Sequence, residues 1–302
     1  MATFVAQSTC MLSLKRVPPI LCSLTLLILA AGCNTAGTTA VVKKEGPAEV
    51  AKQPTPAPAP APVAPVDLVD HKFDRQPFTY DSTKKYIYLT FDDGPMGGTK
   101  DCMDVCRQLG VKATFFMVGR HAADKWGKIL VNEIKQSYPQ FLLANHSYTH
   151  ANEHYKFFYQ HPDFSEADFL KAQDSLHVPY KIIRLPGNSA WVRKGEDKSS
   201  HLVSAVCKRL DSTGYNVIGW DEEWNFTRGQ SFPVQSPAKI ASQMDYAASG
   251  HSHLKNHVVL LSHDRMFRTP AYKDSLTKFI TIMKQNPNYV FETIDNYPGL
   301  KF

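Results

Sequence analysis

Two adjacent carboxylates, Asp92 and Asp93, are the first residues in this chain whose types and spacing point to chemistry. They lie in the run LTFDDGP at 89–95. Like charges this close are costly unless a cation, a hydrogen-bond donor or a proton separates their roles. The pair therefore indicates a metal site, and an ordinary Asp-Gly-Pro turn is the structural alternative.

Two histidines form the second candidate group. His146 and His150 lie four residues apart in the run HSYTH. This spacing predicts that both occupy one face of a helix, where their imidazole nitrogens can share a metal ion. Together with a carboxylate from a neighbouring strand end, they would supply the His-His-carboxylate set of a catalytic zinc site, which leaves one position open for water.

The elements that must position these residues alternate between strand-like and helix-like segments. A run of aromatic and β-branched residues predicts a first strand that ends at the aspartate pair. Six more strands are expected further along the chain, and the seven ranges are 86–91, 113–118, 141–144, 180–185, 215–220, 257–262 and 289–291. Alternation with helices implies parallel strands joined by right-handed crossovers. About seven such units fit a β/α barrel in size.

The positions of the polar residues favour this barrel over a doubly wound sheet. The candidates follow the ends of five different strands, and they are Asp92-Asp93, His146, Arg184, Asp221 and His263. In a β/α barrel all the strand ends meet at one rim, where catalytic residues gather. A doubly wound sheet brings fewer strand ends to a single crevice.

Four separated motifs resemble those of the NodB-type polysaccharide deacetylases, carbohydrate esterase family 4. TFDDG at 90–94, HSYTH at 146–150, RLPG at 184–187 and LSH at 261–263 look like its first, second, third and fifth motifs. Four motifs in the family's order are more specific than any one of them. The resemblance covers the chain from about Lys85 to the C-terminus and implies an α/β fold, a distorted (β/α)7 barrel of the NodB-homology type. The catalytic domain is expected at residues 67–302.

By this resemblance Asp93, His146 and His150 would bind a divalent metal. Zn²⁺ is expected, with Co²⁺ or another divalent ion as alternatives. The ion would lower the pKa of its water and polarise an acetamide carbonyl.

The resemblance also assigns the proton transfers. Asp92 would be the general base, and Arg184 would pair with Asp92 and keep it ionised. His263 would protonate the departing amine.

Two motifs depart from the family pattern. Gly187 directly follows Pro186 in the third motif, which lacks the residue that usually separates them. The fourth motif, usually Asp-x-x-Asp-Trp, corresponds to WDEEWN at 220–225. Trp224 matches the tryptophan that lines the substrate groove, and Asp221 is expected to tune His263, with Glu223 as the alternative.

The implied activity is hydrolysis of the N-acetyl groups of an amino-sugar polysaccharide, such as peptidoglycan, poly-N-acetylglucosamine or a chitin-like glycan. The altered motifs allow a different class of protein, a catalytically impaired glycan-binding protein of the envelope on the same fold. A third hypothesis is that the protein hydrolyses a different amide, such as a peptide or a small molecule. The net charge of +6 forms no dense basic run, so no nucleic acid is expected, and no protein partner is predicted.

The N-terminal segment predicts export. Lys15 and Arg16 precede an apolar run at 20–29, and the small residues 30–32 come directly before Cys33. This pattern resembles the lipobox of bacterial lipoproteins. It predicts a signal peptide at 1–32 and a lipidated Cys33, with a Pro/Ala-rich tether at 33–66. The domain would then lie in the periplasm or outside the cell, and the alternative is a soluble secreted protein.

Overall fold

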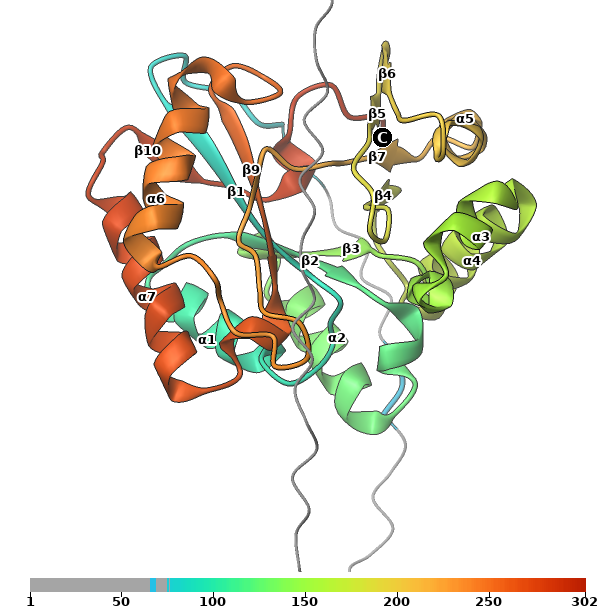
Figure 1. The fold of residues 1–302 in the computed structure, drawn as a ribbon, viewed down its shortest axis with the longest axis horizontal. Coiled ribbons are helices and arrows are strands. Elements are labelled where there is room, and N and C mark those ends of the chain that lie inside the picture. Colours follow the sequence, from blue (N-terminus) through green and yellow to red (C-terminus); the bar gives the residue numbers. More distant parts are fainter. Residues whose placement is uncertain (1–65, 69–74, 76) are drawn as a thin grey trace, which may run out of the picture. The chain divides into compact units, whose positions relative to one another are not determined.

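A computed structural model describes residues 66–68, 75 and 77–302 (Figure 1). The predicted signal peptide, Cys33 and nearly all of the tether lie outside the described residues. In the part of the chain that is described, no helix is long and apolar enough to cross a membrane.

The described chain alternates strands and helices, as the sequence predicts. The strands are β1 (Lys85–Asp92), β2 (Ala113–Met117), β3 (Phe141–Asn145), β4 (Ile182–Ile183), β5 (Trp191–Arg193), β6 (Glu196–Lys198), β7 (Asn216–Val217), β8 (Glu222–Glu223), β9 (His257–His263) and β10 (Tyr289–Phe291). The α-helices are α1 (Thr99–Gln108), α2 (Lys125–Gln136), α3 (Tyr155–Gln160), α4 (Pro162–Ser175), α5 (Ser204–Ser212), α6 (Pro237–Tyr246) and α7 (Pro270–Lys284).

One chain segment closes the sheet into a ring. The strands follow the order β6-β5-β7-β4-β3-β2-β1-β9-β8, and β7 pairs with β4 while β8 pairs with β9, both in parallel. Between β7 and β8, the Ile218 N–H donates to the Ile183 carbonyl and the Asp221 N–H donates to the Val259 carbonyl, each at 2.9 Å. The predicted distorted (β/α)7 barrel is therefore confirmed.

The distortion has two sources. The strand expected at 215–220 is reduced to β7, and β8 follows beyond that range, because the chain pairs with β4 first and with β9 a few residues later. β10 pairs only with the start of β1, whereas β2 pairs with its end. The antiparallel hairpin of β5 and β6, which the sequence did not indicate, lies against β7.

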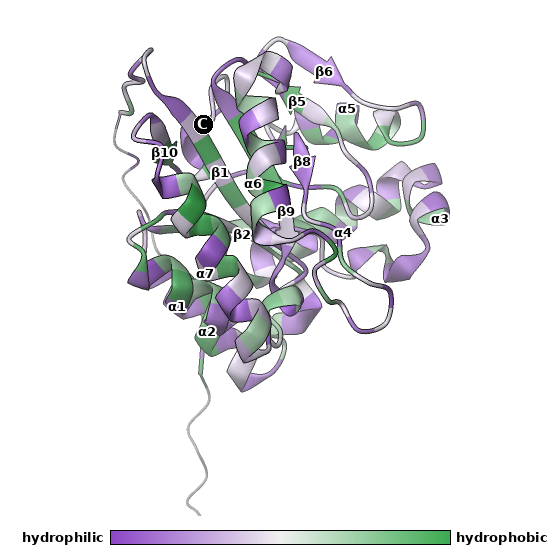
Figure 2. Cartoon of the chain, turned by 60° about the vertical axis from the view of Figure 1, so that its left-hand side comes forward, coloured by the Kyte–Doolittle hydropathy of each residue, from purple (hydrophilic) through white to green (hydrophobic). Residues whose placement is uncertain are grey.

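Strand β1 has two buried faces with different partners. Tyr86 and Tyr88 belong to a cluster of side chains inside the barrel, while Ile87 and Leu89 pack with residues of the surrounding helices. Figure 2 shows the hydrophobic residues of β1 among helices that carry both hydrophobic and hydrophilic residues. Because side chains alternate along a strand, the inward register continues to Asp92 and carries that carboxylate to the barrel rim.

The buried His257 at the start of β9 should make stability depend on pH. Burial lowers its pKa to about 4, whereas an unfolded histidine titrates near 6.5. Between these values the unfolded chain binds more protons, so the free energy of unfolding should fall as the pH falls from about 6.5 to about 4, by up to about 3 kcal/mol.

Urea unfolding across this pH range tests the effect. His257→Gln should lose this part of the pH dependence, while His154→Gln, at an exposed position, should keep it. Equal pH dependence in wild type and His257→Gln would contradict the assignment.

Candidate metal and catalytic site

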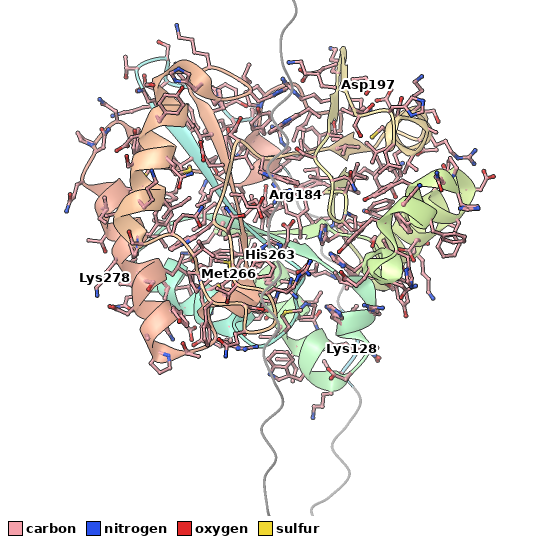
Figure 3. The ribbon with its side chains drawn as sticks, in the orientation of Figure 1. Lys128, Arg184, Asp197, His263, Met266 and Lys278 are labelled. Atoms are coloured by element: carbon pink, nitrogen blue, oxygen red, sulfur yellow. The ribbon has the colours of Figure 1, made fainter. Side chains whose placement is uncertain are left out.

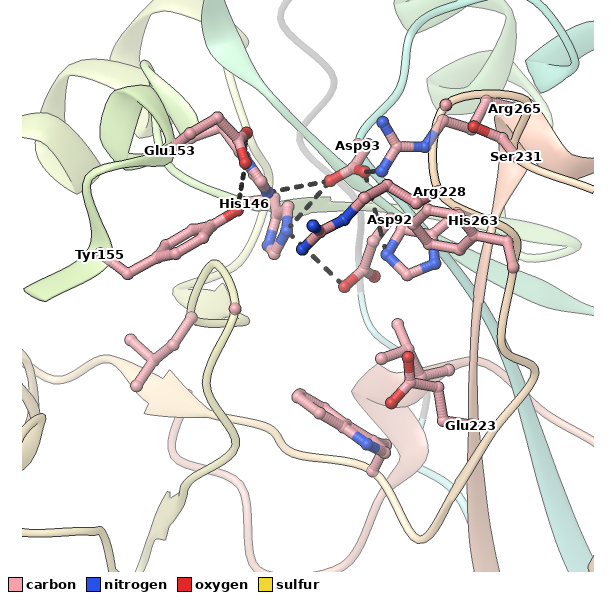
Figure 4. Close-up of a pocket in the computed structure, with 17 residues that line it drawn as sticks. Asp92, Asp93, His146, Glu153, Tyr155, Glu223, Arg228, Ser231, His263 and Arg265 are labelled. Carbon is pink, nitrogen blue, oxygen red and sulfur yellow. Dashed lines mark hydrogen bonds and ion pairs between the residues drawn. The ribbon is translucent and has the colours of Figure 1, made fainter. Parts of the chain in front are cut away.

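Most of the predicted site residues meet at the carboxyl ends of the barrel strands. A cleft of about 490 Å³ opens there, within the usual size of ligand sites, and Asp92, Asp93, His146, His150 and His263 all line it (Figure 4). Residues that are far apart in the chain therefore share one cleft because each follows the end of its own parallel strand.

Asp93 and the two histidines form a cluster suited to a metal. Their candidate ligand atoms all lie within 4.8 Å of one another. His150 Nε2 lies 3.1 Å and His146 Nε2 lies 3.5 Å from Asp93 Oδ1. His146 Nδ1 donates to the Arg184 carbonyl at 2.9 Å, and His150 Nδ1 donates to Glu153 at 2.7 Å. With Nδ1 protonated in this way, each Nε2 presents its lone pair to the cluster.

The electrostatics of Asp93 fit a divalent cation. The residue is buried, its Oδ1 lies beside the Nε2 atoms of both imidazoles, and its Oδ2 forms an ion pair with Arg265. Burial opposes ionisation, but hydrogen bonds and positive charge from protonated His146 and His150 hold the pKa of Asp93 well below its usual value. A bound cation would take the place of these protons. One buried, ionised oxygen ligand and two imidazole nitrogens are a donor set that Zn²⁺ prefers.

The two histidines do not lie on a helix, contrary to the expectation from their spacing. His146 directly follows β3, and His150 begins the short 3-10 turn η2 (His150–Glu153). Ser147 and His150 have φ angles of 66° and 53°, so the backbone turns back on itself between β3 and η2. The fold brings the imidazoles together through this turn rather than through helical periodicity.

Arg184 contacts Asp92, as the resemblance implies. The guanidinium Nη1 donates to Asp92 Oδ1 at 2.9 Å and to Thr90 Oγ1 at 2.6 Å. Arg184 is fully buried inside the barrel, with its guanidinium 4.2 Å from the centre of the Phe116 ring (Figure 3). This pairing leaves Asp92 Oδ2 on the side of the cleft, 3.7 Å from His146 Nε2.

The prediction that Asp221 tunes His263 is wrong. His263 Nδ1 is buried without a hydrogen-bond partner among the described residues. The Asp221 carboxylate instead accepts the backbone N–H groups of His253 and Val259, at 2.5 and 2.7 Å. Asp221 lies in the segment that closes the barrel, so its carboxylate joins that segment to the chain around β9. The alternative, Glu223, lines the cleft but makes no described contact with His263.

The prediction that Trp224 lines the groove is also wrong. Its ring is fully buried and packs against Phe267 and Phe279, and its Nε1 donates to the Gln235 carbonyl at 2.9 Å. Trp220 lines the cleft instead. The motif match predicted this role for Trp224 alone, and the course of the barrel-closing segment brings Trp220 to the cleft in its place.

Arg265 is a cleft residue that the motifs did not reveal. It comes two residues after His263, and its Nη2 lies 2.8 Å from Asp93 Oδ2. Its guanidinium also lies 4.6 Å from the centre of the Phe226 ring. The sequence signal that could have found it is a cationic residue two positions after the fifth motif.

The shortened third motif leaves Arg184 in place. Gly187 has a φ of 62°, and a Cβ there would approach the Tyr155 ring to 3.0 Å. Glycine therefore permits both this backbone conformation and the close approach of Tyr155 to the cleft.

Comparison with known proteins gives consistent matches. A family model described as polysaccharide deacetylase matches residues 79–190. The putative polysaccharide deacetylase YheN of Bacillus subtilis is 27% identical over 70% of this chain and 68% of its own length. A chitin disaccharide deacetylase of Vibrio alginolyticus is 24% identical over 76% of this chain and 75% of its own length.

Solved structures support the same fold. A family 4 carbohydrate esterase from Streptococcus mutans superposes with a TM-score of 0.52 at 24% identity, over 70% of this chain and 86% of that one. The catalytic domain of peptidoglycan N-acetylglucosamine deacetylase from Eubacterium rectale also superposes with a TM-score of 0.52. The sequence identity is 22%, over 74% of this chain and 95% of that one.

The two tryptophans should respond differently to truncation. Trp224→Leu removes a fully buried ring and should lower the free energy of unfolding by about 3 kcal/mol. Trp220→Leu should lower the free energy of unfolding by less than half as much, because the Trp220 side chain is partly exposed at the cleft. Chemical denaturation measures both, and equal losses would contradict the buried and cleft-lining assignments.

Proposed function

The chain belongs to the NodB-type polysaccharide deacetylases, and from that premise we propose that it removes N-acetyl groups from an amino-sugar polysaccharide of the bacterial envelope by metal-dependent hydrolysis. The observation that carries the proposal is the buried cluster of Asp93, His146 and His150 beside the ion pair of Asp92 and Arg184. Binding a sugar alone requires neither a metal cluster nor a positioned base.

Asp93, His146 and His150 would hold the metal, with Zn²⁺ favoured by the donor set and Co²⁺ or another divalent ion as alternatives. When bound, such an ion polarises the acetamide carbonyl and lowers the pKa of a water molecule. The Nδ1 hydrogen bonds of the histidines keep both rings in the orientation that this role needs.

Asp92 and His263 would carry out the proton transfers of the reaction. Arg184 holds Asp92 Oδ1, so Asp92 Oδ2 is the oxygen that accepts the proton of the attacking water. Water adds to the acetamide carbonyl carbon, and the C–N bond then breaks. His263, 3.8 Å from Asp93 Oδ2 across the cleft, delivers a proton to the departing nitrogen. The products are acetate and the free amine of the sugar.

The aspartate pair gives a matched test of this division of roles. Asp93→Asn should weaken Zn²⁺ binding by at least about 10-fold, since it removes a ligand charge. Asp92→Asn should keep Zn²⁺ binding but lower turnover by about 10²- to 10⁴-fold, since it removes the base. Chelation should abolish acetate release, and added Zn²⁺ should restore it.

Calorimetry with Zn²⁺ and acetate release from N-acetylated glycans provide the two readouts. Glu222→Gln is the control, because the Glu222 carboxylate contacts Gln243 and does not line the cleft. Full activity in strong chelator would rule out the metal assignment. Sugar binding without acetate release from any glycan would favour the glycan-binding alternative.

We also propose that the protein is exported and anchored through a lipid on Cys33, which places the domain in the periplasm or outside the cell. The support is the lipobox-like sequence before Cys33 and the Pro/Ala-rich segment after it. A Pro-rich tether of this kind is extended and would let the domain reach polymer away from the membrane.

Metabolic labelling with an alkyne fatty acid in a bacterial host tests the anchor. The wild-type chain should be labelled and fractionate with membranes, whereas Cys33→Ala should be unlabelled. Cys207→Ala, which alters a cysteine inside the folded domain, should remain labelled. A labelled Cys33→Ala protein would refute the anchor site.

A further inference from the structure

The cleft contains cationic groups that the proposed chemistry does not use. Arg228 and Arg265 both line it and come from separate loops (Figure 4). Within the described chain, Arg228 has no ion-pair or hydrogen-bond partner. Arg265 pairs with Asp93 through Nη2, but its buried Nε has no partner. Arg228 is exposed on the cleft rim. A guanidinium presents a planar array of donors that matches a carboxylate, so the donors without a protein partner are available to an anionic ligand.

The backbone that carries Arg228 is held in a closed turn. The Thr227 N–H donates to the Phe232 carbonyl at 2.8 Å, and the Phe232 N–H donates to Thr227 Oγ1 at 3.0 Å. Arg268 Nη2 donates to the Gln230 carbonyl of the same turn at 3.0 Å. The position of the Arg228 backbone on the cleft rim is therefore set by hydrogen bonds to the backbone groups of this turn.

The acids of the cleft do not neutralise Arg228. Asp92 is paired with Arg184, and Glu153 contacts His150 and the Tyr155 hydroxyl. Glu223 lines the cleft as well, but no ion pair joins it to Arg228 in the described chain. A divalent cation at Asp93 would add further positive charge. The charge of Arg228 therefore remains available to a ligand.

Aromatic side chains complete a surface suited to a sugar. Trp220, Tyr155 and Phe226 line the same cleft, and the Phe226 ring already contacts both Arg265 and His263. Aromatic faces pack against the apolar faces of sugar rings, while nearby polar groups fix their orientation. A sugar held here would bring any acidic substituent close to the arginines.

We propose that this cleft selects an acidic glycan, in which the N-acetylated ring or its neighbour carries a carboxylate, and that Arg228 binds this carboxylate. The inference rests on the proposed deacetylase function and narrows its substrate class. The chain's net charge of +6 agrees with it, because a positive field attracts an acidic polymer. Arg265, held between Asp93 and Phe226, supplies the second cation of the site.

A pair of ligands that differ only in charge tests the inference. One is a tetrasaccharide that alternates N-acetylglucosamine with N-acetylmuramic acid, and the other is the same tetrasaccharide with its lactyl carboxylates converted to methyl amides. Calorimetry is done on zinc-loaded full-length protein carrying Asp92→Asn, which prevents turnover. The acidic form should bind about 10-fold more tightly than the neutral form, as expected for one charge-assisted pair.

Substitution of Arg228 should remove this preference. Adding Arg228→Gln should make the two ligands bind equally, with little change for the neutral form, and Arg228→Lys should retain part of the preference. Arg209→Gln is the charge-matched control, because Arg209 lies on α5 and pairs with Glu166. It should leave the preference intact.

Four results would overturn the inference. They are equal binding of both ligands before substitution, binding of neither ligand, a preference that survives Arg228→Gln, and an equal loss of the preference in Arg209→Gln. Acetate release by the wild-type protein is measured separately and decides the proposed function. A protein that prefers the acidic ligand through Arg228 but releases no acetate would support carboxylate recognition and refute the deacetylase function.

Discussion

The buried guanidinium of Arg184 connects the parts of the barrel that the site depends on. It donates to Thr90 and Asp92 on β1, and to the Ile218 and Gly219 carbonyls in the segment that closes the ring. A buried charge is costly unless its counter-ion and hydrogen-bond partners are all present. Here they come from β1 and the closing segment, while Arg184 itself follows β4. Forming this ion pair with all of its partners thus requires the end of β4, β1 and the closing segment to be assembled together.

The aspartate pair shows how one local change of backbone gives adjacent identical residues different roles. Asp92 continues the inward register of β1 and meets Arg184. Asp93 has a φ of 77°, which is unfavourable for a residue with a side chain. That turn aims its carboxylate at His146 and His150 instead. The repulsion expected between two neighbouring acids is relieved because each faces a different cation or donor.

The closing segment between β7 and β8 explains why two assigned roles failed. It has only a few residues between β7, which pairs with β4, and β8, which pairs with β9. The direction of each side chain in this segment is therefore fixed by the path that closes the barrel. Asp221 is used to bind backbone N–H groups of the chain around β9, and Trp224 is used to fill the core beneath Phe267. Trp220 and Glu223 are the residues of this segment that remain at the cleft.

The sequence by itself determined the barrel, the strand ends that carry the polar residues, and the group of Asp92, Asp93, His146, His150, Arg184 and His263. These follow from alternating hydrophobicity and from motif spacing, which are local properties of the chain. Only the tertiary structure decided that a tight turn, and not a helix, joins the two histidines, and that Trp220 rather than Trp224 faces the cleft. It also brought Arg228 and Arg265 to the same cleft. These outcomes depend on ring closure and on loop conformation, which bring together residues that no local pattern relates.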